Sequence, residues 1–107
     1  MAAPAPVALI TGAGRGIGRV LAQSYSAAGY RVAITGRTVE PLEETAALVR
    51  DAGGTVLVVP GDVRDEAACA ELVAATVGEL GQLDVLLNNA AVPGTDMGVA
   101  DMELANW

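Results

Sequence analysis

The sequence predicts an α/β fold in which helices cover both faces of a parallel sheet, and three observations support this. Four short apolar runs have the character of buried strands, and a segment with helical spacing follows each of the first three. The first strand enters its helix through a turn that holds four glycines in seven residues. Successive β–α–β units of this kind have right-handed crossovers. We therefore expect an incomplete, doubly wound parallel sheet of four strands in the order 3-2-1-4.

Length and composition indicate one globular domain. The chain has 107 residues, of which 52% are hydrophobic, enough for a single core. We assign residues 1–6, rich in Pro and Ala, to a flexible leader and residues 7–107 to the domain. No apolar run approaches the ~20 residues of a membrane helix, and the leader lacks the basic start of a signal peptide. We expect a cytoplasmic location, in agreement with the single cysteine, Cys69, which cannot form an internal disulfide.

The charge distribution limits the partners. A net charge of −7 argues against a nucleic acid or an anionic membrane surface, because both require clustered positive charge. All six basic residues are arginines, and the chain contains no lysine and no histidine. We expect no metal site. Any contact with a phosphate must be made locally, by backbone N–H groups and one or two arginines.

The first predicted unit is a strand at residues 7–10, a glycine loop and a helix at residues 17–28, with Gly29 ending the helix. Free N–H groups and the helix dipole favour an anion at the start of a helix, and glycines let a diphosphate approach. A turn without a ligand is the alternative. The predicted apolar face of the helix is Ile17, Val20, Leu21, Tyr25 and Ala28. The candidate phosphate-binding residues are Thr11, Gly12, Ala13, Gly14, Arg15, Gly16, Ile17 and Gly18.

The residues after the second strand indicate which dinucleotide is bound. That strand is predicted at residues 31–35, and many dinucleotide folds place an Asp or Glu after it to bind the adenosine ribose. Here Gly36 and Arg37 follow instead. A guanidinium can bind a 2′-phosphate through two parallel hydrogen bonds, whereas a carboxylate would repel it. We therefore favour NADP(H) as the cofactor, with NAD(H) as the alternative. Arg37 could instead be a solvated turn residue that binds no ligand.

The remaining elements complete the alternation. A helix capped by Thr38, with Pro41 in its first turn, ends at Gly53-Gly54 and has Leu42, Ala46 and Val49 on its inner face. A strand at residues 55–59, a helix at residues 65–80 and a strand at residues 83–87 follow. The inner face of the third helix is predicted as Ala68, Leu72, Ala75 and Leu80. Residues 93–98 are expected to form a loop and residues 101–107 the start of a helix.

Two motifs carry a family resemblance. The glycine loop has the form T-G-x-x-x-G-x-G, with Thr11, Gly12, Gly16 and Gly18 at its fixed positions. The fourth strand runs into Asn88-Asn89-Ala90-Ala91, close to an Asn-Asn-Ala-Gly signature. In both features the chain resembles the short-chain dehydrogenase/reductase family. The resemblance implies a Rossmann-type fold and an NAD(P)-dependent enzyme that interconverts an alcohol and a ketone.

The resemblance also implies roles for individual residues. Arg15 and Arg37 stand where basic residues accompany a preference for NADP. Asp62 and Val63 stand where the family contacts adenine, whose amine and ring nitrogen suit a carboxylate and a backbone N–H; Asp62 could equally be a turn or capping residue. Asn89, with Ala90, lines the nucleoside pocket in this interpretation, or Asn89 braces the sheet. Ala91 replaces the signature's glycine, which leaves the geometry after Ala90 open.

The residues for catalysis are not found. The family uses a Tyr-x-x-x-Lys pair with a Ser and an Asn, whereas this chain has only Tyr25 and Tyr30 and no lysine. We expect no catalytic residue here, and a chain that supplies the cofactor-binding half of an enzyme acting on a small carbonyl or alcohol. A non-catalytic nucleotide-binding module and an inactive fragment are the alternatives. A methyltransferase is the structural rival, although it would more often have an acid after the second strand.

The fourth strand is expected to lie at an open edge of the sheet. Parallel strands are normally covered on both faces, so an exposed apolar edge favours pairing with another chain. We therefore expect self-association or marginal stability of the isolated chain.

Overall fold

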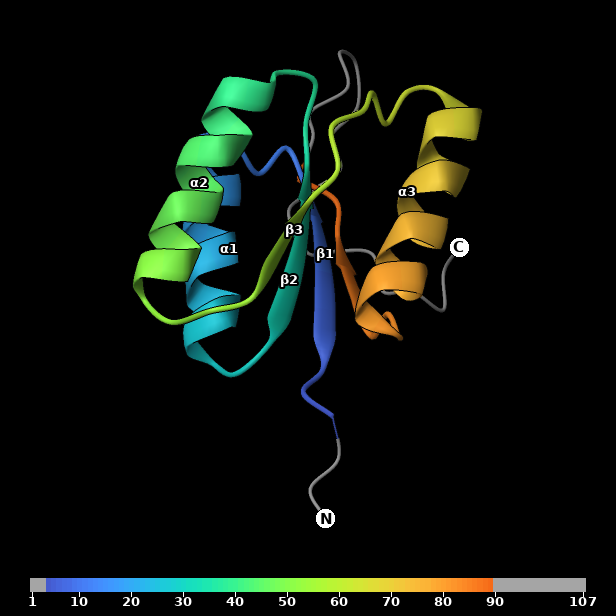
Figure 1. The fold of residues 1–107 in the computed structure, drawn as a ribbon. Coiled ribbons are helices and arrows are strands. Elements are labelled where there is room, and N and C mark those ends of the chain that lie inside the picture. The colour runs from blue at the N-terminus through green and yellow to red at the C-terminus, as the bar shows by residue number, and fades with distance from the viewer. Residues whose placement is uncertain (1–3, 90–107) are drawn as a thin grey trace.

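The computed structural model describes residues 4–89 and shows one parallel sheet of four strands in the order β3-β2-β1-β4 (Figure 1). This confirms the predicted Rossmann-type α/β fold and its strand order. Residues 90–107, which include Ala90, Ala91, the predicted loop and the last predicted helix, lie outside the described range. The elements in chain order are β1 (Val7–Thr11), α1 (Gly16–Ala27), β2 (Arg31–Thr35), α2 (Val39–Asp51), β3 (Val56–Val58), α3 (Glu66–Leu80) and β4 (Val85–Leu87).

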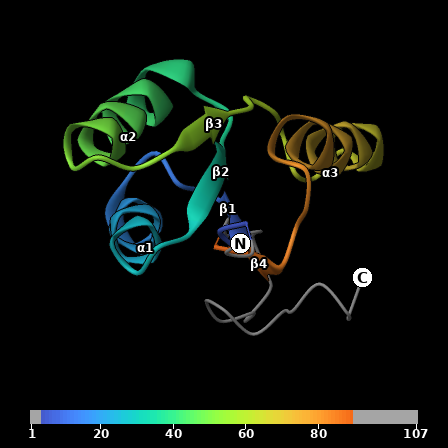
Figure 2. The ribbon, with the colours of Figure 1, turned by 60° about the horizontal axis from the view of Figure 1, so that its bottom comes forward.

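The helices lie in two layers. Helices α1 and α2 cover one face of the sheet and α3 covers the other (Figure 2). Because side chains alternate along a strand, β1 serves both layers. Ala8 and Ile10 belong to the core beneath α1 and α2, and Leu9 belongs to the core beneath α3. All five residues of β1 are buried, as expected for a central parallel strand.

The inner face of α1 agrees with the prediction at Leu21 and Tyr25, which pack against the core, and differs from it at Ile17, Val20 and Ala28, which are exposed. Gly18 and Ala22 are its buried residues, whereas Ile17 and Val20 are 62% and 58% exposed. The glycine loop fixes this rotation, because Gly18 must lie against the loop. Residues four apart share a helix face, so Ala22 turns inward with Gly18. Ile17 and Val20 are then directed outward, and apolar spacing alone could not reveal this.

The helix ends follow most of the predicted signals. Asp65, predicted as the first residue of the third helix, is instead the N-cap of α3 and accepts a hydrogen bond from the Ala67 N–H at 2.9 Å, and Gly81 ends the same helix in the left-handed region. Gly29 has a φ of 99° just past α1, as predicted. Thr38 occupies the N-cap position of α2, but its side chain makes no capping hydrogen bond.

The third and fourth strands are shorter than predicted, although pairing extends beyond them. Thr55 accepts from the N–H of Val32, and Val59 donates to the carbonyl of Ile34, so β3 is extended by one bond at each end. Before β4, the carboxylate of Asp84 accepts from the Val7 N–H at 2.8 Å. The side chain of Asp84 therefore takes up the first backbone N–H of β1, just before β4 begins.

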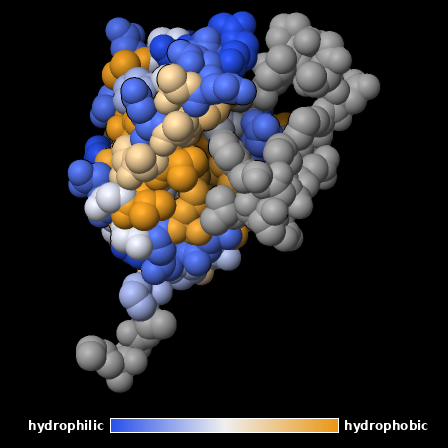
Figure 3. Space-filling model, turned by 90° about the vertical axis from the view of Figure 1, so that its right-hand side faces the viewer, coloured by the Kyte–Doolittle hydropathy of each residue, from blue (hydrophilic) through white to orange (hydrophobic). Residues whose placement is uncertain are grey.

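The described edge of the sheet at β4 has a strand neighbour on one side only, which is β1. Among residues 4–89, α3 is the one helix on its face of the sheet, opposite α1 and α2. Figure 3, which views the molecule from the side of α3, shows apolar side chains gathered at the surface there. No helix in the described part of the chain has the length and apolar character needed to span a membrane.

Candidate functional site

The predicted site residues gather at one edge of the sheet. Parallel strands place their carboxyl ends together, and ligands in open α/β sheets bind outside those ends. The segments after Thr11, Thr35, Val58 and Leu87 all meet there, at the upper edge of the sheet in Figure 1. The glycine loop, Arg37, Asp62 and Asn89 are thus neighbours in space, although they are up to 78 positions apart in sequence.

The glycine loop has the backbone that its sequence requires. Gly12 has a φ of 61°, in the left-handed region that other residues avoid. A Cβ on Gly18 would collide with the carbonyl oxygen of Gly12 and lie 2.7 Å from Nδ2 of Asn89. The first turn of α1 therefore packs directly on the loop. Substitution at Gly18 would force the two apart.

The start of α1 offers free backbone donors. The N–H groups of Gly16, Ile17 and Gly18 have no intrahelical partner, and no other backbone carbonyl of residues 4–89 accepts from them. Arg15 occupies the N-cap without a capping side-chain bond. Together with the helix dipole, this arrangement suits an anion.

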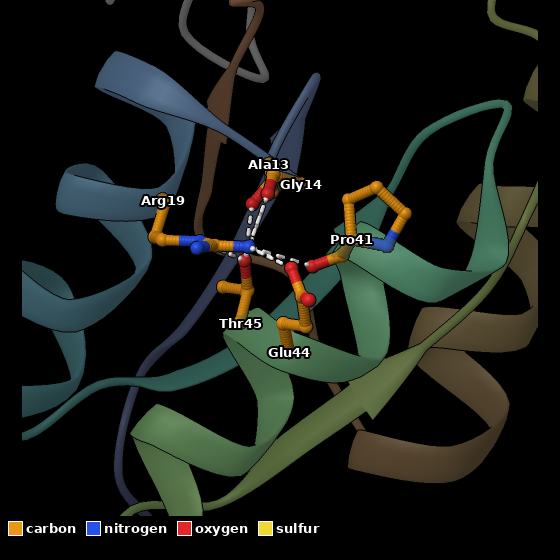
Figure 4. Close-up of polar contacts among 6 residues, drawn as sticks. All are labelled: Ala13, Gly14, Arg19, Pro41, Glu44 and Thr45. Atoms are coloured by element: carbon orange, nitrogen blue, oxygen red, sulfur yellow. Dashed lines mark hydrogen bonds and ion pairs between the residues drawn. The ribbon is translucent and has the colours of Figure 1, made fainter.

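The carbonyl groups of the loop are bound by side chains from elsewhere. Asn89 Nδ2 donates to Gly12 O at 3.2 Å, and Thr45 Oγ1 donates to Ala13 O at 2.9 Å. Arg19 Nη2 donates to Gly14 O at 2.7 Å (Figure 4). The partly negative carbonyl oxygens of Gly12, Ala13 and Gly14 therefore accept hydrogen bonds from side chains of the protein.

Arg15 and Arg37 line the same hollow. It measures about 200 Å³ and lies between the glycine loop and the start of α2, with Gly14, Thr38 and Pro41 also in its wall. Both arginines are exposed, and within residues 4–89 neither forms an ion pair. The structure thus brings together the two arginines that the sequence associates with a 2′-phosphate.

Asp62 is engaged by a neighbour. Arg64 donates from Nη2 to Asp62 Oδ2 at 2.8 Å and from its backbone N–H to Oδ1 at 3.0 Å. The Arg64 hydrogen bonds lower the pKa of Asp62 to about 2, and the charge of Arg37 acts in the same direction. A small hollow beside it is lined by Thr35, Pro60 and Val63. An adenine amine at this position would share the carboxylate with Arg64.

Asn89 braces the sheet, as one of the two interpretations expects. Its backbone N–H donates to Thr11 Oγ1 at 2.9 Å, while Thr11 Oγ1 donates to Asn88 Oδ1 at 3.0 Å. With the bond from Asn89 to Gly12, these contacts join the end of β4 to the end of β1 and to the loop.

Sequence reasoning missed Arg19 and Thr45. Thr45 lies on the same face of α2 as Leu42, Ala46 and Val49 and is fully buried. A hydroxyl on an apolar face requires a partner, and this signal was available in the sequence. Arg19 gave no such signal, because an arginine on a helix is usually solvated.

Comparisons with known proteins agree on one family. The family model for short chain dehydrogenases matches residues 6–107. A Streptomyces violaceoruber protein, named as a ketoacyl reductase of the granaticin polyketide synthase, is 46% identical over 105 residues, which cover 94% of this chain and 41% of that protein. An 11-beta-hydroxysteroid dehydrogenase-like protein of Arabidopsis thaliana is 41% identical over 90 residues, 83% of this chain and 29% of that protein.

A solved structure shows the same similarity in three dimensions. A variant of the actinorhodin polyketide ketoreductase, crystallised with NADPH, superposes with a TM-score of 0.80 and 39% identity. The match covers 91% of this chain and 38% of that one, so the chain spans less than half the length of these relatives. By the family match, the identities and the shared fold, this chain belongs to the short-chain dehydrogenase/reductase family.

Proposed function

We propose that this chain is the cofactor-binding part of an NADP(H)-dependent oxidoreductase that interconverts an alcohol and a ketone. Family membership supports an NAD(P)-dependent oxidoreductase. The hollow shared by Arg15 and Arg37 is the observation that supports NADP(H) in particular. The names of the ketoreductase relatives, one of them solved with NADPH, support reduction of a ketone.

The residues at the sheet edge fit a dinucleotide. The free N–H groups at the start of α1 would hold the diphosphate, and Gly18 keeps that turn close to the loop. Arg15 and Arg37 would bind the 2′-phosphate, whose charge two guanidinium groups match well. Asp62 and Val63 would face the adenine, and Asn89 and Ala90 the nucleoside. When bound, NADP(H) supplies or accepts the hydride of the reaction.

A proton donor for the reaction is not provided by the tyrosines of this chain. Tyr25 lies near the end of α1 and Tyr30 directly precedes β2, so both are at the opposite edge of the sheet from the glycine loop. Their rings pack edge to face with centroids 5.0 Å apart. We propose that residues 7–107 form the cofactor-binding domain in the cytoplasm and that catalysis requires residues from outside this chain.

The proposal is tested by titrating the chain with NADPH and, separately, with NADH. We expect tighter binding of NADPH. Arg37→Ala should weaken NADPH binding about 10- to 150-fold, the effect of one charge-assisted hydrogen bond of about 1.5–3 kcal/mol, and leave NADH nearly unchanged.

Arg50→Ala is the matched control, since Arg50 is an exposed arginine in the last turn of α2, away from the loop. Equal affinity for the two dinucleotides, or an unchanged NADPH affinity in Arg37→Ala, would contradict the preference. Absence of binding by the folded chain would contradict the proposed function itself.

A second candidate is a nucleotide-binding module that works through a partner, because the free N–H groups of the loop and the hollow between Arg15 and Arg37 suit binding of a nucleotide without any chemical step. Both candidates bind the cofactor, so turnover separates them. If the remaining part of a relative, added separately, restores ketone reduction with NADPH, the chain is part of an enzyme. If the chain alone reduces a ketone, the assignment of catalysis to other residues is wrong.

A further inference from the structure

We propose that Arg19 and Thr45 are positioning residues for the glycine loop, which orient its peptide groups for a cofactor diphosphate. The inference rests on the proposed function, because it concerns how the loop would meet that ligand. Figure 4 shows the two side chains converging on the loop from α1 and α2.

Arg19 joins three segments through one side chain. Its Nη2 donates to Gly14 O at 2.7 Å and Pro41 O at 3.2 Å, and lies 3.1 Å from Glu44 Oε1. Its Nε donates to Thr45 Oγ1 at 2.9 Å. The side chain is only 28% exposed, so the guanidinium is held largely within the protein.

Thr45, on α2, connects Arg19 to the glycine loop. It is fully buried, and its hydroxyl both accepts from Arg19 and donates to Ala13 O at 2.9 Å, with Gly14 O at 3.3 Å as a second acceptor. The two side chains therefore hold the carbonyl oxygens of Ala13 and Gly14 toward α2. Their positions are interdependent, because Thr45 accepts from the same guanidinium that binds Gly14.

The orientation of the carbonyls determines the orientation of the amides. No peptide bond between residues 4 and 89 is cis, so in this range the N–H of each peptide group points away from its C=O. Fixing Ala13 O and Gly14 O toward α2 directs the N–H groups of Gly14 and Arg15 away from it. No backbone carbonyl of residues 4–89 accepts from either. The loop thus presents donors, and not carbonyl oxygens, on its free side.

If Arg19 and Thr45 served only to join α1 to α2, they would not need to donate to the carbonyl oxygens of the glycine loop. Pro41 O and Glu44 lie on α2 and would suffice for that purpose. Gly14 O, the nearest acceptor of Arg19, and Ala13 O, the nearest acceptor of Thr45, belong instead to the loop. The contact therefore constrains the part of the molecule that would bind the diphosphate.

The test compares a ligand that contains the diphosphate with one that lacks it. NADPH and adenosine 2′-monophosphate are titrated calorimetrically into the wild-type chain and into Thr45→Val, Thr45→Ser, Arg19→Ala and Arg50→Ala. Thr45→Val removes the hydroxyl at nearly constant volume, and Thr45→Ser retains it. Arg50→Ala removes one exposed arginine of α2 as the charge control for Arg19→Ala. Thermal unfolding of each variant checks that it is folded.

We expect Thr45→Val and Arg19→Ala to weaken NADPH binding about tenfold, the effect of roughly one charge-assisted hydrogen bond to the diphosphate. Adenosine 2′-monophosphate should be affected less than about twofold, and Thr45→Ser should restore NADPH affinity. An equal loss for both ligands would identify a general structural fault and overturn the inference, as would unchanged affinity for NADPH.

The two proposals fail in different ways. If the folded wild-type chain binds neither ligand, the proposed function fails and this inference fails with it. If the wild type binds NADPH and the Thr45 and Arg19 variants bind it equally well, only the inference fails.

Discussion

Gly18 shows how narrowly a single position of this fold is constrained. Its missing side chain allows α1 to contact Gly12 and Asn89, and the same contact fixes which residues of α1 face the core. The sequence motif identified Gly18 as a loop residue. It did not identify the contact with Asn89, which lies 71 positions later, because a motif of adjacent residues does not show which distant residue will pack against it.

Asp62 gives a prediction for the dependence of stability on pH. Hydrogen bonds from Arg64 lower the pKa of its carboxyl in the folded chain from 3.8 to about 2. A lowered pKa stabilises the fold above the unfolded pKa, and that contribution is lost as the pH falls through the folded value. The melting temperature of the wild type should therefore exceed that of Asp62→Asn near neutral pH. The difference should shrink between about pH 4 and about pH 2.

Glu71→Gln is the control for this experiment, because Glu71 is an exposed carboxylate of α3 and forms no ion pair within residues 4–89. High salt should reduce the difference for Asp62→Asn, since the pair with Arg64 is partly exposed. A difference that stays constant across the whole range would contradict the role of the ionised carboxyl.

At the scale of elements, the three described helices differ in whether a side chain caps their first turn. Asp65 caps α3 with a side-chain hydrogen bond, Thr38 stands at the start of α2 without one, and α1 begins without a side-chain cap at Arg15. The sequence predicted Thr38 as a cap from its residue type. Residue type defines what a side chain can do, whereas its rotamer and surroundings decide what it does.

These caps provide a matched pair of substitutions. Asp65→Ala should lower the free energy of unfolding by about 0.5–2 kcal/mol, the usual effect of losing an N-cap hydrogen bond. Thr38→Ala should change it by less than about 0.5 kcal/mol, because no such bond is lost. Urea unfolding of both variants and the wild type measures the two changes. Equal losses would show that the contact of Asp65 with the Ala67 N–H contributes little.

For the molecule as a whole, strand order and layers could be predicted from the sequence, because each strand, helix and turn carries a local signal. The glycine loop and Arg37 were found in the same way. The Arg19 and Thr45 contacts could not be, since they depend on which side chains the completed fold brings together. The hydrogen bond from the Arg64 N–H to Asp62, by contrast, spans two positions and agrees with the turn that the sequence offered as an alternative for Asp62. The cofactor roles of the site residues stay a prediction until binding is measured.

The open edge at β4 leads to a prediction about association. Of the described strands, β4 pairs on one side only, and the face that carries α3 has apolar side chains at its surface (Figure 3). We expect the isolated chain to self-associate or to unfold with low cooperativity. Sedimentation velocity over a range of concentrations, together with thermal unfolding, measures both. A monodisperse monomer with a cooperative transition would contradict the expectation.

The bond from Asn89 Nδ2 to Gly12 O also has a consequence for synthesis on the ribosome. It joins residues 77 positions apart, so the loop is held on that side by a residue that follows β4. The nascent chain can form β1, α1 and β2 early, but this contact must wait until β4 has emerged and paired with β1. The glycine loop is thus translated well before β4, but it reaches its final shape only after β4 has paired with β1.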